Sequence, residues 1–242
     1  MTSKSIVYLI PSFLSEDSID TIPVYIIDAV KDCKVIFAEN ERTARRFLKS
    51  MCKACLPREQ EIVIDDYEWF TIHKAEAEQI AVFKQKIKEE KNIAIISEAG
   101  CPGIADPGQI LVHAAQQMNV TVKPLVGPSS VLLALMASGM NGQQFQFVGY
   151  LSIDAQPRAN KLKELEEESA RKKCTQIFIE TPYRNNQLLE AILKTCRPST
   201  QLCIAVELTS KNEFIKTKSI ADWRNEKIDL HKKPVIFLIL AV

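Results

Sequence analysis

The segment 97–108, SEAGCPGIADPG, combines residue types that can hold a small-molecule ligand at the end of a β-strand. It follows the apolar run IAII and precedes a helical pattern, and ligands of open α/β sheets bind beyond such strand ends. Gly100 and Gly103 allow the backbone to approach a ligand closely, and the Glu98 carboxylate can accept hydrogen bonds from ribose hydroxyls or amino groups. Asp106, directly before a proline, is interpreted as the N-cap of the following helix. The segment therefore predicts a ligand site in the middle of the chain.

The segment VGPSS, 126–130, is a second candidate for ligand binding. Its Gly-Pro pair predicts a turn, and Ser129 is expected to cap an apolar helix whose first N–H groups are free. Such a turn can hold an anionic or hydrogen-bonding ligand, although a capped core helix without a ligand fits equally well. Neither GxGxxG nor GxxxxGK[ST] occurs in the chain, which argues against kinase, GTPase and dehydrogenase functions.

Basic residues recur at helical spacing in the region 42–55, and no acidic residue lies between them: they are Arg42, Arg45, Arg46, Lys49 and Lys53. A one-sided positive helix can contact nucleic-acid phosphates. The same pattern is also typical of the solvated face of an amphipathic helix, and the sequence leaves both interpretations open.

Two further strand ends carry candidate functional residues. The motif ETPYR, 180–184, follows the run IFI, and its Tyr183 and Arg184 can stack on a base and bind phosphate. Glu180 in this motif and Glu207 after the run IAV are carboxylates at strand tips, where they can face a ligand or simply cap a loop.

The elements that must position these residues follow two patterns. The first half alternates strands and helices, which predicts a mostly parallel sheet with helices on both faces: strands are expected at 5–10, 34–38, 61–65, 93–97 and 121–124, and helices at 24–30, 42–55, 73–90 and 107–118. The second half ends in strands without long helices between them, which predicts a mixed sheet: strands are expected at 146–149, 175–179, 202–206, 213–217 and 234–240, and helices at 129–137, 158–173 and 185–196. We therefore expect two α/β domains, 1–122 and 123–242.

Composition restricts the class of protein further. The chain is 46% hydrophobic and 25% charged with a net charge of +1, which is typical of a soluble globular protein and argues against a generally basic nucleic-acid coat. No apolar run approaches the roughly 20 residues of a membrane span. The seven scattered cysteines indicate reduced thiols and a cytoplasmic protein, and no metal site is predicted from the three distant histidines.

Taken in order, seven segments resemble one known family. AENERTARRFL, SEAGCPGIADPG, VGPSS, ASGM, FVGYL, ETPYR and AVELTSKNE are similar to its AEDTRxTRxLL, SDAGTPxISDPG, PGPSA, ASGL, FxGFLP, ESPHR and ARELTKxHE motifs. This is the bacterial 16S ribosomal RNA cytidine 2′-O-methyltransferase family, a branch of the tetrapyrrole methylases, which are class III S-adenosylmethionine-dependent methyltransferases. The resemblance implies that S-adenosylmethionine binds in a cleft between the two domains and that the protein is a homodimer.

The resemblance also implies roles for individual residues. The domain 1–122 would carry the acceptor side and part of the cofactor site, and 123–242 the rest of the cofactor site. Residues matching the family's cofactor-binding positions are Leu14, Glu98, Gly100, Ile104, Ser129, Ser130, Leu151, Ala205 and Pro234. Those expected to bind the substrate are Arg42, Arg45, Tyr183 and Arg184. A base is needed to activate a ribose hydroxyl, and the unranked candidates are Glu39, Glu180 and Glu207.

Three of the chain's departures from the family pattern concern the candidate site. Its first loop, IPSFLSEDSID, lacks the glycine of the family's TPIGN; Glu98 replaces an aspartate; and Tyr183 replaces the histidine of ESPHR. The leading hypothesis is an S-adenosylmethionine-dependent methyltransferase that modifies a ribose of ribosomal RNA. Methylation of a tetrapyrrole or another small molecule, and a cofactor-binding paralogue without catalysis, remain alternatives.

Overall fold

The computed structural model describes residues 5–55, 62–72 and 76–241, with only the backbone at positions 55 and 76. The chain divides into two compact units, Met1–Ser129 and Ser130–Val242. We expected a division between residues 122 and 123. The strand β5 (Thr121–Pro124) instead pairs in parallel with β1 (Ile6–Ile10), so residues 123 and 124 belong to the N-terminal sheet.

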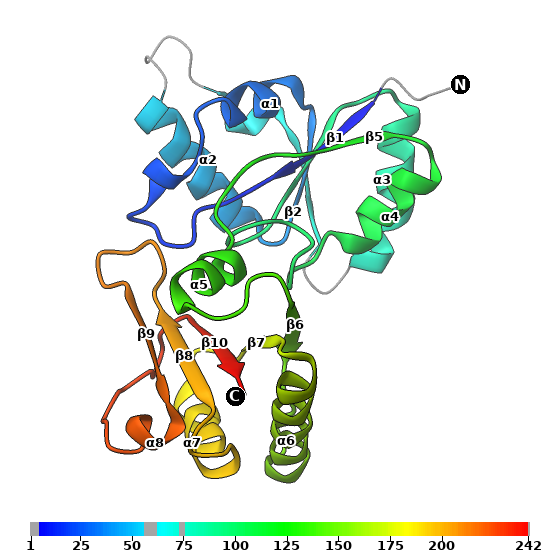
Figure 1. The fold of residues 1–242 in the computed structure, drawn as a ribbon. Coiled ribbons are helices and arrows are strands. Elements are labelled where there is room, and N and C mark those ends of the chain that lie inside the picture. Colours follow the sequence, from blue (N-terminus) through cyan, green and yellow to red (C-terminus); the bar gives the residue numbers. More distant parts are fainter. Residues whose placement is uncertain (1–4, 56–61, 73–75, 242) are drawn as a thin grey trace. The chain divides into compact units, whose positions relative to one another are not determined.

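The N-terminal unit is built on a five-stranded sheet with the order β3-β2-β4-β1-β5 (Figure 1). All its pairings are parallel, as the alternation of strands and helices predicts. The remaining strands are β2 (Val35–Ala38), β3 (Glu68–Thr71) and β4 (Ile93–Ile96). The central strands β2 and β4 are buried along their whole length, as expected for parallel strands covered on both faces.

Helices cover both faces of this sheet (Figure 1). The pair α1 (Ile26–Asp32) and α2 (Glu41–Cys55) packs against one face, and the pair α3 (Glu76–Lys88) and α4 (Gln109–Gln117) packs against the other. Alternate side chains of each strand supply the two cores, because successive residues of a strand point to opposite faces. Ile10 thus packs with α1 and α2, whereas Val7 packs with α3 and α4.

The third strand lies later in the chain than predicted. We expected a strand at 61–65, but Ile64–Asp66 forms a 3-10 turn and Glu68–Thr71 is the strand. Adjacent aspartates favour a turn, whereas the sequence EWFT carries aromatic residues that favour a strand. Residue 61 and the first residues of the predicted helix 73–90 lie outside the described residues.

The C-terminal unit contains the predicted mixed sheet, with the order β6-β7-β10-β8-β9. β6 and β7 are parallel and the other pairings are antiparallel. The strands are β6 (Phe145–Tyr150), β7 (Thr175–Ile179), β8 (Gln201–Val206), β9 (Phe214–Ser219) and β10 (Val235–Leu240).

One core of this unit joins β7, β8 and β10 to the helices α6 (Ala155–Lys172), α7 (Asn185–Thr195) and the short α8 (Ile220–Trp223), which was not predicted. The helix α5 (Ser130–Ser138) contacts β9 and β10. Thr217 of β9 donates a hydrogen bond to the last carbonyl of this helix, Ser138 O, at 2.7 Å. Across the described parts of both units, no helix is long and apolar enough to cross a membrane.

Candidate functional site

The carboxyl edge of the N-terminal sheet is the first candidate site. Adjacent strands there continue into helices on opposite faces, because β1 and β2 lead to α1 and α2 and β4 leads to α4. Open α/β sheets bind their ligands at such switch points, outside the carboxyl ends of the strands. The loops that follow β1, β4 and β5 therefore surround the expected ligand position.

These three loops are joined to one another by hydrogen bonds. Ser12 N donates to Gly100 O at 2.8 Å, and Gly100 N donates to Ser12 O at 3.0 Å. The Ser12 hydroxyl also donates to Ser97 O at 2.8 Å. Cys101 Sγ donates to Pro128 O at 3.6 Å. The loop after β1 is thus held to the loop after β4, which in turn contacts the loop after β5.

Two glycines permit this close approach. Gly100 has a φ of +71°, and a Cβ atom there would lie 3.3 Å from Leu14 Cδ2 and 3.4 Å from Pro128 O. A Cβ atom on Gly127 would lie only 2.2 Å from Pro11 Cβ, so any side chain there would force the two loops apart. These contacts bring together Leu14, Gly100 and the turn before Ser129, which the sequence resemblance had assigned to one site.

Three carboxyl groups, Glu39, Glu98 and Asp106, lie at this edge. Glu39 is buried and its Oε2 accepts a hydrogen bond from Glu98 N at 2.9 Å. The exposed Glu98 side chain accepts a hydrogen bond from Thr43 Oγ1 at 3.2 Å. Burial, and then the charges of Glu39 and Glu98, raise the pKa of Asp106 to about 7. In the described parts of the chain, no three His, Cys, Asp or Glu side chains form a metal-binding group.

The proposed capping role of Asp106 is wrong. The helix α4 begins only at Gln109, and its N-cap is Gly108, with a φ of 125° and no side-chain capping bond. Asp106 is instead a partly buried carboxyl group near two others, which sequence spacing alone did not reveal. The nearby Ile104, an expected cofactor residue, is 53% exposed.

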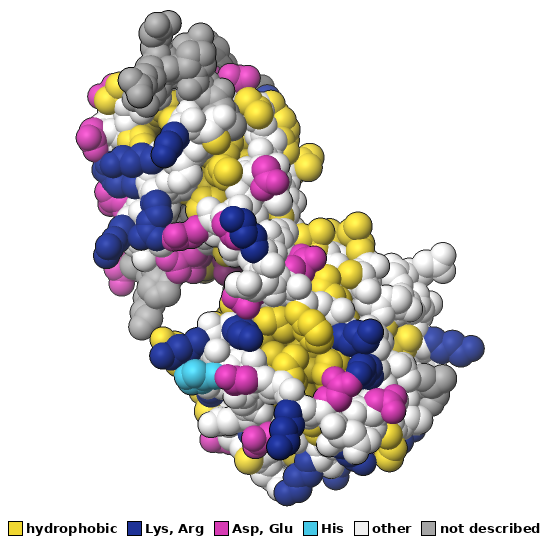
Figure 2. All heavy atoms as spheres, turned by 90° about the vertical axis from the view of Figure 1, so that its left-hand side faces the viewer, with side chains coloured by type: hydrophobic (Ala, Val, Ile, Leu, Met, Phe, Trp, Pro, Cys, Tyr) yellow, Lys and Arg dark blue, Asp and Glu magenta, His cyan; other side chains and the backbone are white. Residues whose placement is uncertain are grey.

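The basic residues of α2 differ in their availability. Arg45 forms ion pairs with Glu41 at 2.7 Å and Asp65 at 2.6 Å, and its guanidinium lies 4.6 Å from the centre of the Trp69 ring. Arg46 pairs with Glu16. Figure 2 shows basic and acidic side chains mixed on the face of the N-terminal unit that carries α2.

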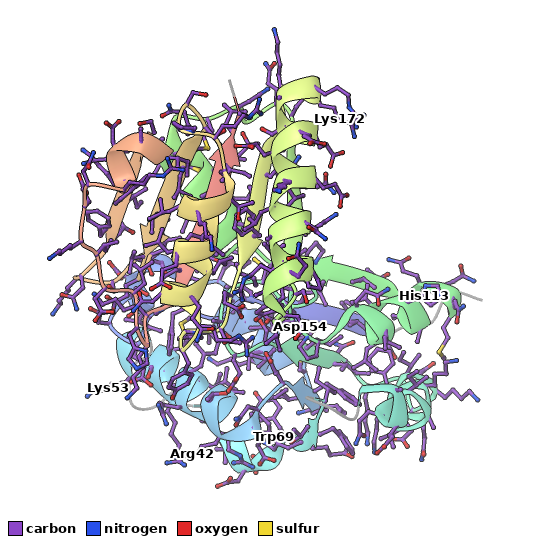
Figure 3. The ribbon with its side chains drawn as sticks, turned by 90° about the horizontal axis from the view of Figure 1, so that it is seen from below. Arg42, Lys53, Trp69, His113, Asp154 and Lys172 are labelled. Atoms are coloured by element: carbon purple, nitrogen blue, oxygen red, sulfur yellow. The ribbon has the colours of Figure 1, made fainter. Side chains whose placement is uncertain are left out.

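Three other cations of this helix, Arg42, Lys49 and Lys53, are exposed and form no ion pair with any described residue. Figure 3 shows Arg42 and Lys53 projecting outward from α2. These three side chains are exposed, whereas Arg45 is held by its two ion pairs.

The C-terminal unit presents a second group of candidate residues at one edge of its sheet. β6, β7 and β8 end there and β10 begins there, which places Leu151, Glu180, Glu207 and Pro234 along the same edge. Glu207 N donates to Pro234 O at 3.0 Å. Leu151 and Ala205 are buried, and Ser130 is the first residue of α5. The expected cofactor residues thus form two groups, one on each unit.

Glu180 is engaged in a buried ion pair. Its side chain is fully buried, and its Oε1 accepts hydrogen bonds at 2.6 Å from both Arg184 Nη2 and Thr181 N. Burial raises the pKa of Glu180, but these hydrogen bonds and the Arg184 charge outweigh burial, so the pKa is lowered overall. A carboxylate held in this way is a poor proton acceptor. Tyr183, which precedes Arg184 in the sequence, is exposed.

Comparisons with known proteins place the chain in a family. The model of the tetrapyrrole (corrin/porphyrin) methylases matches residues 18–223. The ribosomal RNA small subunit methyltransferase I of Bacillus subtilis is 32% identical over 228 residues, which cover 93% of this chain and 72% of the relative. That of Vibrio cholerae is 34% identical over 174 residues, which cover 70% of this chain and 59% of the relative. The chain therefore belongs to the tetrapyrrole methylase family, as the sequence motifs indicated.

Solved structures of this family share the fold. The methyltransferase CobJ matches with a TM-score of 0.64 at 16% identity, covering 98% of this chain and 94% of that one. The precorrin-6Y methylase from Archaeoglobus fulgidus matches with a TM-score of 0.58 at 16% identity, covering 99% of both chains. The predicted arrangement of two α/β domains is thus confirmed. The chain spans less than two thirds of several curated relatives, with 54% of the Buchnera aphidicola protein and 59% of the Vibrio cholerae protein covered.

Proposed function

We propose that the protein is an S-adenosylmethionine-dependent methyltransferase that methylates a ribose 2′-hydroxyl of small-subunit ribosomal RNA. The observation that carries this proposal is the junction of the loops after β1, β4 and β5 at the switch point of a tetrapyrrole methylase fold. The ribosomal RNA acceptor is supported by the names of the curated relatives and by the exposed cations of α2.

The residues present fit such a cofactor. The exposed Glu98 carboxylate can accept hydrogen bonds from ribose hydroxyls or an amino group, and Gly100 leaves its backbone free of a side chain. On the C-terminal unit, Leu151 and Ala205 are apolar residues near the edge of the sheet, a type of side chain suited to pack against an adenine ring. We infer that these residues, together with Ile104, Ser129, Ser130 and Pro234, hold S-adenosylmethionine, which supplies an electrophilic methyl group on a sulfonium.

The protein's own contribution is to position the acceptor hydroxyl and to remove its proton. Of the carboxylates considered, Glu180 is the least suited, because its ion pair with Arg184 lowers its proton affinity. Asp106 is a further candidate, because a general base works best when its pKa is near the operating pH, and the pKa of Asp106 is raised to about 7. We therefore add Asp106 to Glu39 and Glu207 as a candidate for the general base.

The cofactor site is tested by titrating the purified protein with S-adenosylmethionine in a calorimeter. We expect saturable binding of one molecule per chain, weakened at least tenfold by Glu98→Ala and by Ser129→Ala, which corresponds to about 1.4 kcal/mol. Glu167→Ala, on the exposed face of α6, is the matched control and should bind as the parent does. An absence of binding in the parent protein would contradict the proposal and favour a structural role.

The acceptor is tested by transfer of a labelled methyl group. We expect label in the RNA of small ribosomal subunits that lack the modification, and none in a tetrapyrrole substrate. The double change Arg42→Glu with Lys49→Glu should abolish transfer to RNA and leave S-adenosylmethionine binding intact. Transfer to the tetrapyrrole alone, undiminished by this change, would replace RNA with a small-molecule acceptor. Cofactor binding without transfer to either would indicate a non-catalytic paralogue.

We further propose that the protein works in the cytoplasm as a homodimer. The family resemblance supports the dimer, and the six described cysteines, all free, are compatible with a reducing compartment. Sedimentation equilibrium would give about twice the chain mass of 27.3 kDa for a dimer.

A further inference from the structure

The most accessible aromatic side chain at the edge of the C-terminal sheet belongs to a pair of rings. Tyr183 is 68% exposed, and its ring packs edge-on against the ring of His231, with centroids 6.0 Å apart. The two residues come from separate segments, the loop after β7 and the loop before β10. An exposed aromatic ring offers a face on which an unpaired nucleobase can stack.

Hydrogen bonds hold the loop that carries His231 in place. Lys232 N donates to Pro182 O at 2.9 Å, and Asn185 Nδ2 donates to Lys233 O at 2.7 Å. Asn186 accepts from Leu230 N and donates to Asp229 Oδ1, both at 2.8 Å. Lys232 has a φ of 60°, an unfavourable conformation for a lysine that these bonds stabilise.

The surroundings of the two rings carry positive charge. Lys232 and Lys233 follow His231, and neither side chain is fully buried, whereas Arg184, which follows Tyr183, is paired with Glu180. Asp229 is the acidic side chain nearest in sequence to His231, and it is engaged by Asn186 Nδ2 and His231 N. Figure 2 shows a histidine between basic and acidic side chains on this unit.

We propose that Tyr183 and His231 form a stacking platform for an unpaired base of single-stranded RNA, with Lys232 and Lys233 contacting the adjoining phosphates. Recognition of RNA outside its helices combines these two features, aromatic faces for splayed bases and cations for the backbone. This inference rests on the proposed function, since it assigns a specific part of the RNA contact to the C-terminal unit.

The test measures binding of a fluorescein-labelled single-stranded oligoribonucleotide of about twelve nucleotides, a length within the range typical of single-strand sites. Tyr183→Ala is expected to weaken binding by about 5- to 100-fold, the range that follows from the loss of one base stack. Tyr183→Phe keeps the ring and should bind within about twofold of the parent, and His231→Ala should weaken binding less than Tyr183→Ala does.

Two controls separate this inference from the proposed function. A fully paired RNA duplex should bind Tyr183→Ala and the parent equally, and S-adenosylmethionine affinity should be the same in both. Equal affinity of Tyr183→Ala and the parent for the single strand would overturn the stacking platform while leaving the proposed function intact. Failure of the parent to bind single-stranded RNA, with S-adenosylmethionine still bound, would overturn both the platform and the RNA acceptor.

Discussion

At the scale of single residues, Asp106 couples the candidate site to pH. Its pKa is raised to about 7, so between about pH 4 and pH 7 the folded protein retains a proton that the unfolded chain has released. The folded state binds more protons in this window, and stability is therefore expected to decrease as the pH rises through it. A negative charge at this position opposes folding because the carboxyl group is partly buried and because Glu39 and Glu98 carry like charges.

The change Asp106→Asn removes this unfavourable charge. We expect the free energy of unfolding at pH 7.5 to increase by about 1–2 kcal/mol, less than the roughly 4 kcal/mol of a full three-unit shift, because the side chain is partly exposed to solvent. At pH 4 the gain should vanish, since the carboxyl group is then protonated. Urea unfolding at both pH values measures the effect.

Asp229→Asn is the control, because its effect on stability should have the opposite sign to that of Asp106→Asn. Its hydrogen bonds from Asn186 and from His231 N lower the pKa of Asp229, so its charge is favourable and its loss should destabilise the protein above pH 4. A loss of stability on Asp106→Asn at pH 7.5 would show that its charged form is stabilised.

The buried pair Glu180–Arg184 leads to a second prediction at this scale. Glu180→Gln leaves Arg184 without its carboxylate, and we expect a loss of about 2 kcal/mol, below the 3–5 kcal/mol of fully buried pairs because Arg184 keeps some contact with solvent. Since the pKa of Glu180 is lowered, the pair's contribution should be lost as the pH falls through that lowered value. Glu168→Gln, which breaks the pair with the exposed Lys172, should cost clearly less, because solvent screens this pair. If Glu180→Gln and Glu168→Gln lowered stability equally in thermal unfolding, the buried pair would be no more stabilising than the Glu168–Lys172 pair, which would contradict this prediction.

At the scale of elements, the loop after β5 depends on one glycine. Gly127→Ala places a methyl group against Pro11, and the resulting overpacking should cost about 1–3 kcal/mol. Because the shift moves the turn before Ser129, we also expect weaker S-adenosylmethionine binding in the calorimeter. Gly142→Ala has no neighbour within 4 Å and is the control. Unchanged stability and affinity of Gly127→Ala would mean that this loop does not depend on its contact with Pro11.

At the scale of the whole molecule, RNA affinity should come from local groups rather than from overall charge. The chain carries 31 basic and 30 acidic residues, so its net charge provides little attraction. We expect the affinity for single-stranded RNA to fall as the salt concentration rises. A plot of log affinity against log salt concentration should have a slope of about −2, as for roughly three phosphate contacts.

The two candidate contact surfaces should affect this slope differently. Arg42→Glu with Lys49→Glu should make it shallower by about 1–2, since it removes phosphate contacts. Tyr183→Ala should lower the affinity at every salt concentration without changing the slope, because it removes a stacking contact. Identical slopes for the parent and the α2 double variant would exclude α2 from the RNA interface.

The sequence alone determined the class of the fold and most of its elements. Apolar runs of strand length that alternate with helical patterns predicted a parallel sheet at 5–124 and a mixed sheet after it, because periodicity and burial follow from local residue order. The glycine-containing motifs at strand ends identified the loops of the candidate site, since the demand for close backbone approach is also local.

Tertiary structure decided the properties that depend on residues distant in sequence. The position of β4 between β1 and β2, which creates the switch point, results from long-range strand pairing that no local pattern encodes. The pairing of Arg45 with Asp65, the raised pKa of Asp106 and the contact of Tyr183 with His231 likewise depend on side chains that folding brings together. Charge and proton affinity are set by such neighbours, and for this reason the sequence predicted the loops of the candidate site but not the ionisation of its groups.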